Sequence, residues 1–273
     1  MNYGLSTSLL TGERLNSHIL DNILATGVRE IEIMAARQHL DYRDSNQVRD
    51  VAQWFSDHGL TLRSLHAPLY DDLDWGRRGG LTISIACLER RLRIASMDEI
   101  KRAIEVAERI PFRYLILHMG LPGEDYDLNK FDAAFTSLEH LRIFAKERGT
   151  EILLENIPSE LSAPARIREF LQYTRLDLKV CFDTGHAHMA GGVQPAFDTL
   201  RDRIAAIHVH DNHGEKDEHL PPFEGSIDWT QTVRSFRSLD AQVPILLELN
   251  SQRGEPSVLP RIQNMISRME DIP

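Results

Sequence analysis

Cysteine, long apolar runs and positive charge are all scarce in this chain of 273 residues. The two cysteines, Cys87 and Cys181, are too few and too isolated for a disulfide framework, so we expect buried thiols and a reducing cytoplasm. No apolar run approaches the ~20 residues that cross a bilayer, and the first residues lack the pattern of a signal peptide. We therefore expect no membrane partner.

The formal net charge of −10 argues against a broad nucleic-acid-binding face, but it leaves a local one open. With 42% apolar and 26% charged residues, the composition is that of an ordinary globular protein with a full core. No segment looks like a linker, so we predict a single domain over residues 1–273. The sequence leaves open whether the chain forms a homo-oligomer.

Short β-rich runs alternate with longer amphipathic runs along the whole chain. The predicted strands are 3–8, 30–35, 61–66, 114–118, 152–155, 178–183, 206–210 and 245–249, and the predicted helices include 46–58, 97–110, 131–148, 163–174 and about 256–269. This alternation predicts a parallel sheet, and eight repeats fit a (β/α)₈ TIM barrel. A doubly wound open sheet is the main alternative, but Gly4 and Gly12 do not form its glycine-rich turn.

A histidine or a carboxylate stands at the end of most predicted strands: His66, His118, Glu155, Asp183, His208 and Glu248. An unpaired carboxylate on a buried strand costs several kcal/mol unless something compensates it. No lysine or arginine stands at a strand end to do so, and the sequence therefore predicts a bound cation. The mixture of imidazole and carboxylate favours one to three divalent ions of zinc, manganese, cobalt or iron over magnesium or calcium.

Several motifs make the chain resemble a known superfamily. They are HAP at 66–68, LLEN at 153–156, FDTGH at 182–186, IHVHD at 207–211, DEHLPPFEG at 217–225 and LLE at 246–248. Together they are similar to the xylose isomerase-like TIM-barrel superfamily, which includes sugar phosphate isomerases and epimerases and the endonuclease IV type of apurinic endonuclease. The resemblance implies a TIM barrel and a metal-dependent enzyme.

The resemblance also implies roles for individual residues. In single-metal epimerases of this group the ion is held by residues that match Glu155, Asp183, His208 and Glu248, and the two glutamates also act as acid and base. The trinuclear site of endonuclease IV uses five further ligands, which match His66, His118, His186, Asp217 and His219. His210 lies on the same face of its strand as His208, so either could be the ligand. The resemblance favours His208, because its spacing to Asp211 matches the family.

The first hypothesis is a sugar or sugar-phosphate isomerase or epimerase. A divalent ion would polarise the substrate, and Glu155 and Glu248 would transfer protons through a cis-enediolate. We expect His186, His188, Trp229 and Arg253 to contact the sugar, and Arg77, Arg78 or Arg253 to bind a phosphate group. The sequence of the 217–229 loop, which is similar to that of sugar phosphate isomerases and epimerases, favours this hypothesis. The lack of a basic groove favours it as well.

The second hypothesis is a trinuclear phosphoesterase of the endonuclease IV type, which cleaves a phosphodiester. Glu155 would then be a bridging ligand and not a free base. The presence of all nine matching ligand positions favours this reading. However, Met119-Gly120 follows His118 where the endonucleases have Pro-Gly, and this difference weakens the case for recognition of abasic DNA.

Overall fold

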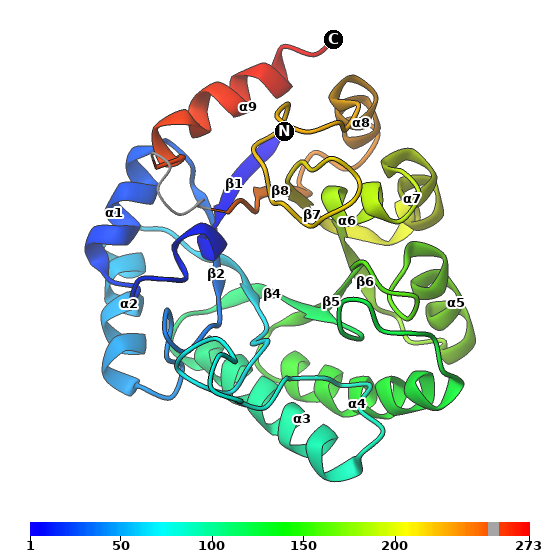
Figure 1. Cartoon of the computed structure of the whole chain (residues 1–273). Helices are drawn as coiled ribbons and strands as arrows, with labels where there is room; N and C mark the ends of the chain where they lie inside the picture. The colour runs from blue at the N-terminus through cyan, green and yellow to red at the C-terminus, as the bar shows by residue number, and fades with distance from the viewer. Residues whose placement is uncertain (251–256) are drawn as a thin grey trace.

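Eight parallel strands close into one barrel in the computed structural model, which describes residues 1–250 and 257–273. Figure 1 looks into the barrel, with the ring of strands at the centre and the helices around it. The strands are β1 (Asn2–Ser6), β2 (Glu30–Met34), β3 (Leu62–His66), β4 (Phe112–His118), β5 (Glu151–Glu155), β6 (Lys179–Asp183), β7 (Ile204–Val209) and β8 (Pro244–Leu247). The predicted TIM barrel with a single domain is confirmed.

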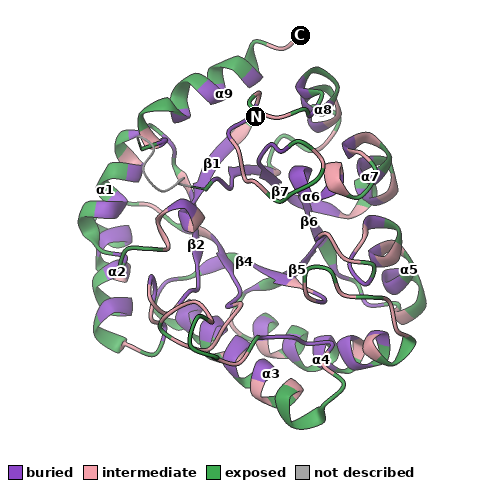
Figure 2. Cartoon of the chain, viewed as in Figure 1, coloured by how far each residue is buried: buried purple, intermediate pink, exposed green. Residues whose placement is uncertain are grey.

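Most helices of the described residues lie on the outside of the barrel and pack against it through their apolar faces, as the buried stripes in Figure 2 show; α6 (Thr184–Met189) instead follows directly on the carboxyl end of β6. The helices are α1 (Ser17–Ala25), α2 (Ser45–Asp57), α3 (Arg90–Ile104), α4 (Leu128–Lys146), α5 (Pro164–Thr174), α6, α7 (Val193–Leu200), α8 (Trp229–Phe236) and α9 (Ile262–Glu270). None of these described helices combines the length and apolar character needed to cross a membrane.

Local sequence signals explain where several helices begin and end. The side chain of Asp44 accepts hydrogen bonds from the first turn of α2, and Asp127 does the same for α4. Gly59 and Gly149 follow these two helices with positive φ, a backbone conformation that glycine adopts without strain. Helix α3 starts seven residues before the predicted 97, because its arginine-rich first turns carry few apolar residues to mark them.

The barrel interior changes from apolar to polar towards the carboxyl ends of the strands. Its lower part is filled by Tyr114, Ile116, Leu153, Cys181, Ala205 and Ala206. Above them, strand register places histidines and carboxylates side by side: His118 pairs with Glu155, and Asp183 pairs with His208. The fold therefore gathers the predicted ligands at one end of the barrel, where TIM barrels carry their active sites.

Candidate metal centre

The predicted ligands surround a cavity of about 320 Å³ at the carboxyl ends of the strands. Its titratable lining residues are His66, His118, Glu155, His186, Asp217, His219 and Glu248. Its apolar lining residues are Met34, Leu69, Trp75, Pro122, Ile157 and Pro158, and Ser8, Thr11 and Asn250 complete the lining. Asp183 and His208 lie directly below, fully buried. Among the described residues, the ligand atoms fall into four groups, three of which contain Glu155. One of these, formed by Glu155, Cys181 and His208, overlaps the group of Glu155, Asp183, His208 and Glu248, so three distinct clusters make up the site.

The first cluster consists of His66, His118 and Glu155. Both histidines point an Nε2 atom at the same carboxylate oxygen, Oε2 of Glu155, at 3.2 Å for His66 and 3.0 Å for His118. Strands β3, β4 and β5 supply one residue each, so the geometry follows directly from the barrel. Three ligand atoms of this kind match the donor set of a zinc-type ion.

The central cluster consists of Glu155, Asp183, His208 and Glu248, whose ligand atoms all lie within 4.8 Å of one another. Nδ1 of His208 lies 2.8 Å from Oε1 of Glu155 and 3.3 Å from Oε2 of Glu248. Glu155 therefore directs one oxygen to the first cluster and the other to the central cluster. Oδ2 of Asp183 is buried and has no hydrogen-bond partner among the described residues, as expected of an atom placed to hold a cation.

The third cluster consists of His186, Asp217, His219 and His210. Oδ2 of Asp217 lies 3.2 Å from Nε2 of His186 and 3.3 Å from Nε2 of His219. The ring of His210 stacks on that of His219, with centroids 3.9 Å apart, and its Nε2 lies 3.0 Å from Oδ1 of Asp183. The structure thus brings His208 to the central cluster and His210 to the boundary between the central and third clusters.

Backbone carbonyls fix the orientation of three of these rings. Nδ1 of His66 donates to the carbonyl of Ala67 at 2.9 Å. In the same way, Nδ1 of His186 donates to the carbonyl of Asn156 at 3.0 Å, and Nδ1 of His219 donates to the carbonyl of Glu248 at 2.9 Å. Because a carbonyl only accepts, Nδ1 carries the hydrogen and Nε2 of a neutral ring presents its lone pair. A lone pair facing a carboxylate oxygen requires a proton or a metal ion between them.

Nearby carboxylates raise the pKa of three histidines at the site. Burial by itself lowers the pKa of a histidine, but the Glu155 carboxylate raises the pKa of His66 to about 9. Against the same effect of burial, Asp183 and Asp217 raise the pKa of His186 to about 10. Asp217 and Glu248 likewise raise the pKa of His219 to about 9. The surplus of buried negative charge attracts cations, and this donor set fits divalent ions.

Two further residues complete the site, and sequence reasoning missed the first of them, Glu32. Oε2 of Glu32, on β2, accepts from Ser64 at 2.7 Å and lies 3.1 Å from Nε2 of His208. This contact leaves Nδ1 of His208 facing the central cluster. The side-chain amide of Asn156 bonds the backbone of Asp183 in both directions, at 2.9 and 3.0 Å. Alternation along β2 places Glu32 on the inner face of the barrel, a signal that could have revealed it.

Two residues predicted to contact substrate lie away from the cavity. Trp229 is buried at the start of α8, where its Nε1 donates to Asp211 at 2.7 Å. Nε2 of His188 lies 2.9 Å from the hydroxyl of Ser226, on the outer side of the loop that follows β7. The expected substrate contacts of Trp229 and His188 are therefore corrected: neither side chain lines the cavity, and both form hydrogen bonds with residues of the loop after β7. Arg253 lies outside the described residues.

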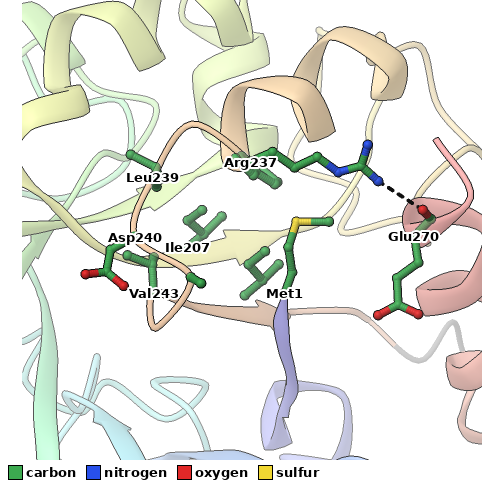
Figure 3. A pocket seen from close by; sticks show the side chains of 10 residues that line it. Met1, Ile207, Arg237, Leu239, Asp240, Val243 and Glu270 are labelled. Atoms are coloured by element: carbon green, nitrogen blue, oxygen red, sulfur yellow. Dashed lines mark hydrogen bonds between the residues drawn. The ribbon is translucent and has the colours of Figure 1, made fainter. Parts of the chain in front are cut away.

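A second cavity, of about 420 Å³, lies at the opposite ends of the strands (Figure 3). It is lined by Met1, Ile207, Phe236, Arg237, Leu239, Asp240, Ala241, Val243, Ile245 and Glu270. Arg237 donates to the backbone carbonyl of Glu270 at 2.9 Å, across one side of the cavity. No cluster of metal-ligand atoms among the described residues lies there, so the chemistry belongs to the other end of the barrel.

Comparison with known proteins identifies the family of the fold. The sequence profile of a family described as xylose isomerase-like TIM barrel matches residues 20–269. An uncharacterized protein of Methanocaldococcus jannaschii is 27% identical over 92% of this chain and 94% of that protein. A probable endonuclease 4 of Haloarcula marismortui is 26% identical over 80% of this chain and 79% of that protein.

Solved structures share the fold over its whole length. A D-tagatose 3-epimerase-like protein superimposes with a TM-score of 0.80 at 22% identity, covering 100% of this chain and 98% of that chain. The IolI protein with a bound zinc atom superimposes with a TM-score of 0.75 at 16% identity, covering 99% and 96%. At these identities the likeness shows the fold alone.

Proposed function

This chain belongs to the xylose isomerase-like TIM-barrel family, and we propose that it is a multinuclear, divalent-metal-dependent phosphoesterase acting on a small phosphoester. The sequence motifs favour a sugar isomerase or epimerase, whereas the arrangement of the side chains favours the second hypothesis. Relatives named as probable endonuclease 4 are consistent with phosphoester chemistry.

The observation that carries the proposal is the division of Glu155 between two clusters. An isomerase that uses Glu155 as acid or base needs one of its oxygens free to exchange a proton with the substrate. Here Oε1 faces His208 at 2.8 Å, and Oε2 faces His118 at 3.0 Å. Although burial raises the pKa of the Glu155 carboxyl, these histidines hold it well below its usual range. Such a carboxylate is a weak base and a good bridging ligand.

Three ions fit the donors, and zinc, manganese, cobalt or iron suits their mixture of nitrogen and oxygen. The first cluster would hold one ion, the central cluster the second, and His186, Asp217 and His219 the third. Ions held there would polarise the phosphoryl group and make a bound water more acidic. The carbonyls behind His66, His186 and His219 keep the ligand rings in place.

The charges around the cavity also favour a phosphoester over a sugar phosphate that reacts at its carbonyl. Among the described residues, no lysine or arginine lines the cavity. Arg78 pairs with Asp74 and has a side chain 90% exposed, and Arg77 does not line the cavity either. Within the described residues, a phosphate group would therefore be held by the cations at the reacting centre. The net charge of −10 argues against a long nucleic acid as the substrate.

A keto-sugar isomerase or epimerase is the second candidate, and one observation favours it. Glu155 and Glu248 both line the cavity, as a pair of proton-transferring groups would. In that case only the central cluster would need an ion. The structural likeness to epimerases is consistent with this candidate, although it extends only to the fold.

Activity of the metal-loaded protein separates the two candidates. We expect hydrolysis of bis(p-nitrophenyl) phosphate or p-nitrophenyl phosphate, and no incorporation of deuterium from solvent into ketoses such as D-tagatose or D-fructose. Glu155→Gln should abolish hydrolysis, and Glu139→Gln, an exposed change on α4, serves as the matched control. Deuterium incorporation without phosphoester hydrolysis would replace the proposal with the second candidate.

A further inference from the structure

One aromatic residue reaches the cavity in a backbone conformation that its kind seldom adopts. Trp75 is one of the apolar lining residues of the cavity and has φ of 62°. Positive φ is rare for a bulky residue with a Cβ atom, and such strain persists only where the surroundings enforce it. The loop that carries Trp75 therefore holds the indole in place at an energetic cost.

Contacts within the loop account for this enforcement. The carboxylate of Asp72 accepts from the backbone N–H groups of Asp74 and Gly76, at 3.2 and 2.9 Å. Tyr70 and Thr82 form an antiparallel bridge at the base of the loop. Gly76 also has positive φ, and a Cβ atom there would collide with the ring of Tyr70. Two successive residues in this conformation form a tight turn, which the loop's own hydrogen bonds stabilise.

The lining of the cavity is partly polar and partly apolar, and Trp75 belongs to the apolar part. The other apolar residues of the lining are Met34, Leu69, Pro122, Ile157 and Pro158. A phosphoester held by cations at the histidines and carboxylates leaves this apolar part of the lining for its organic group. The volume of about 320 Å³ is near the small end of ligand sites, which span roughly 300–1,000 Å³. The organic group is therefore about one ring in size.

We propose that Trp75 is the specificity-determining residue of this site, and that the substrate is a small phosphoester whose organic group carries a neutral ring that stacks on the indole. An aromatic ring and the flat face of a sugar both satisfy this chemistry. The inference rests on the proposed function, because the cations are what place the phosphate. It assigns to Trp75 the substrate contact that the sequence predicted for Trp229.

Binding to the metal-loaded protein tests the inference without the need for turnover. Dissociation constants are measured by calorimetry for inorganic phosphate, methyl phosphate, phenyl phosphate and ribose 5-phosphate. In the wild type, at least one of the two ring compounds should bind about tenfold more tightly than methyl phosphate, as expected for one stacked ring. Trp75→Asn, which removes the ring but tolerates positive φ, should abolish that preference. Trp75→Phe should keep most of it.

The outcomes distinguish this inference from the function on which it rests. Inorganic phosphate should bind wild type and Trp75→Asn equally, because it contacts only the polar part of the lining. A ring preference that is absent from the wild type, or unchanged in Trp75→Asn, overturns the inference and leaves the phosphoesterase standing. Failure of inorganic phosphate to bind the wild type overturns both. A preference for phenyl phosphate identifies an aromatic substrate, and a preference for ribose 5-phosphate identifies a sugar.

Discussion

Removal of the metal ions should make the stability of this protein fall steeply as pH rises. His66, His186 and His219 have pKa values of about 9, 10 and 9 in the folded protein, against an ordinary value of 6.5. A group whose pKa is raised on folding stabilises the fold fully below its unfolded pKa. That contribution is lost as pH rises through the folded pKa. The window for these rings is therefore about pH 6.5 to 10.

The expected effect is large compared with the total stability of a domain. A change of one in pKa corresponds to about 1.36 kcal/mol, so the rise of His219 from 6.5 to about 9 corresponds to about 3 kcal/mol. Domains are stable by only about 5–15 kcal/mol in total. In the proposed metal-loaded protein the same rings would be neutral ligands, with an ion in the place of the proton. The loss across this window should therefore be confined to metal-free protein.

Urea denaturation at pH 6.5, 8 and 9.5 measures the effect on chelator-treated and metal-loaded samples. The metal-loaded sample is the control for every other group that titrates in this range. His219→Asn should flatten part of the slope in the metal-free protein, whereas His140→Asn, an exposed change on α4, should leave it unaltered. A metal-free free energy of unfolding that stays constant from pH 6.5 to 9.5 would refute the reasoning.

Three substitutions test other parts of the account. Glu32→Gln weakens the acceptor behind His208 and should lower metal affinity about 10- to 100-fold, measured by competition with a chromophoric chelator; unchanged affinity would contradict that role. Trp229→Phe removes the bond to Asp211 and should cost about 1–3 kcal/mol in thermal denaturation, with metal content retained. Gly185→Ala places a Cβ atom against the ring of His210, so the third cluster should lose its ion in metal analysis.

The sequence predicted the barrel and the ends of its strands well, because both follow from local patterns. Alternating strand and helix signals reveal the fold, and parallel strands that close into a barrel must bring residues such as Glu155 and Glu248 to one end. The preference for His208 over His210 rested on the resemblance to the family, since both lie on the same face of one predicted strand. The structure places both at the site, in neighbouring clusters.

Contacts made by loops and by the middle of strands could not be predicted in the same way. Glu32 was not predicted as a site residue, because it lies buried in the middle of β2, whereas the predicted ligands stand at strand ends. Trp229 and His188 follow metal-ligand motifs in the chain, yet they turn towards Asp211 and Ser226. The position of Trp75 depends on a turn with two successive positive φ angles, which no periodicity indicates.

The number of metal ions per chain is the most direct test of the proposed three-ion site. Protein purified without chelators and analysed by inductively coupled plasma mass spectrometry should contain close to three divalent ions per chain. Glu155→Gln should lower that number by more than one, since this carboxylate faces both the first and the central clusters. A wild-type value close to one, unaffected by loss of His66 or His219, would contradict the account.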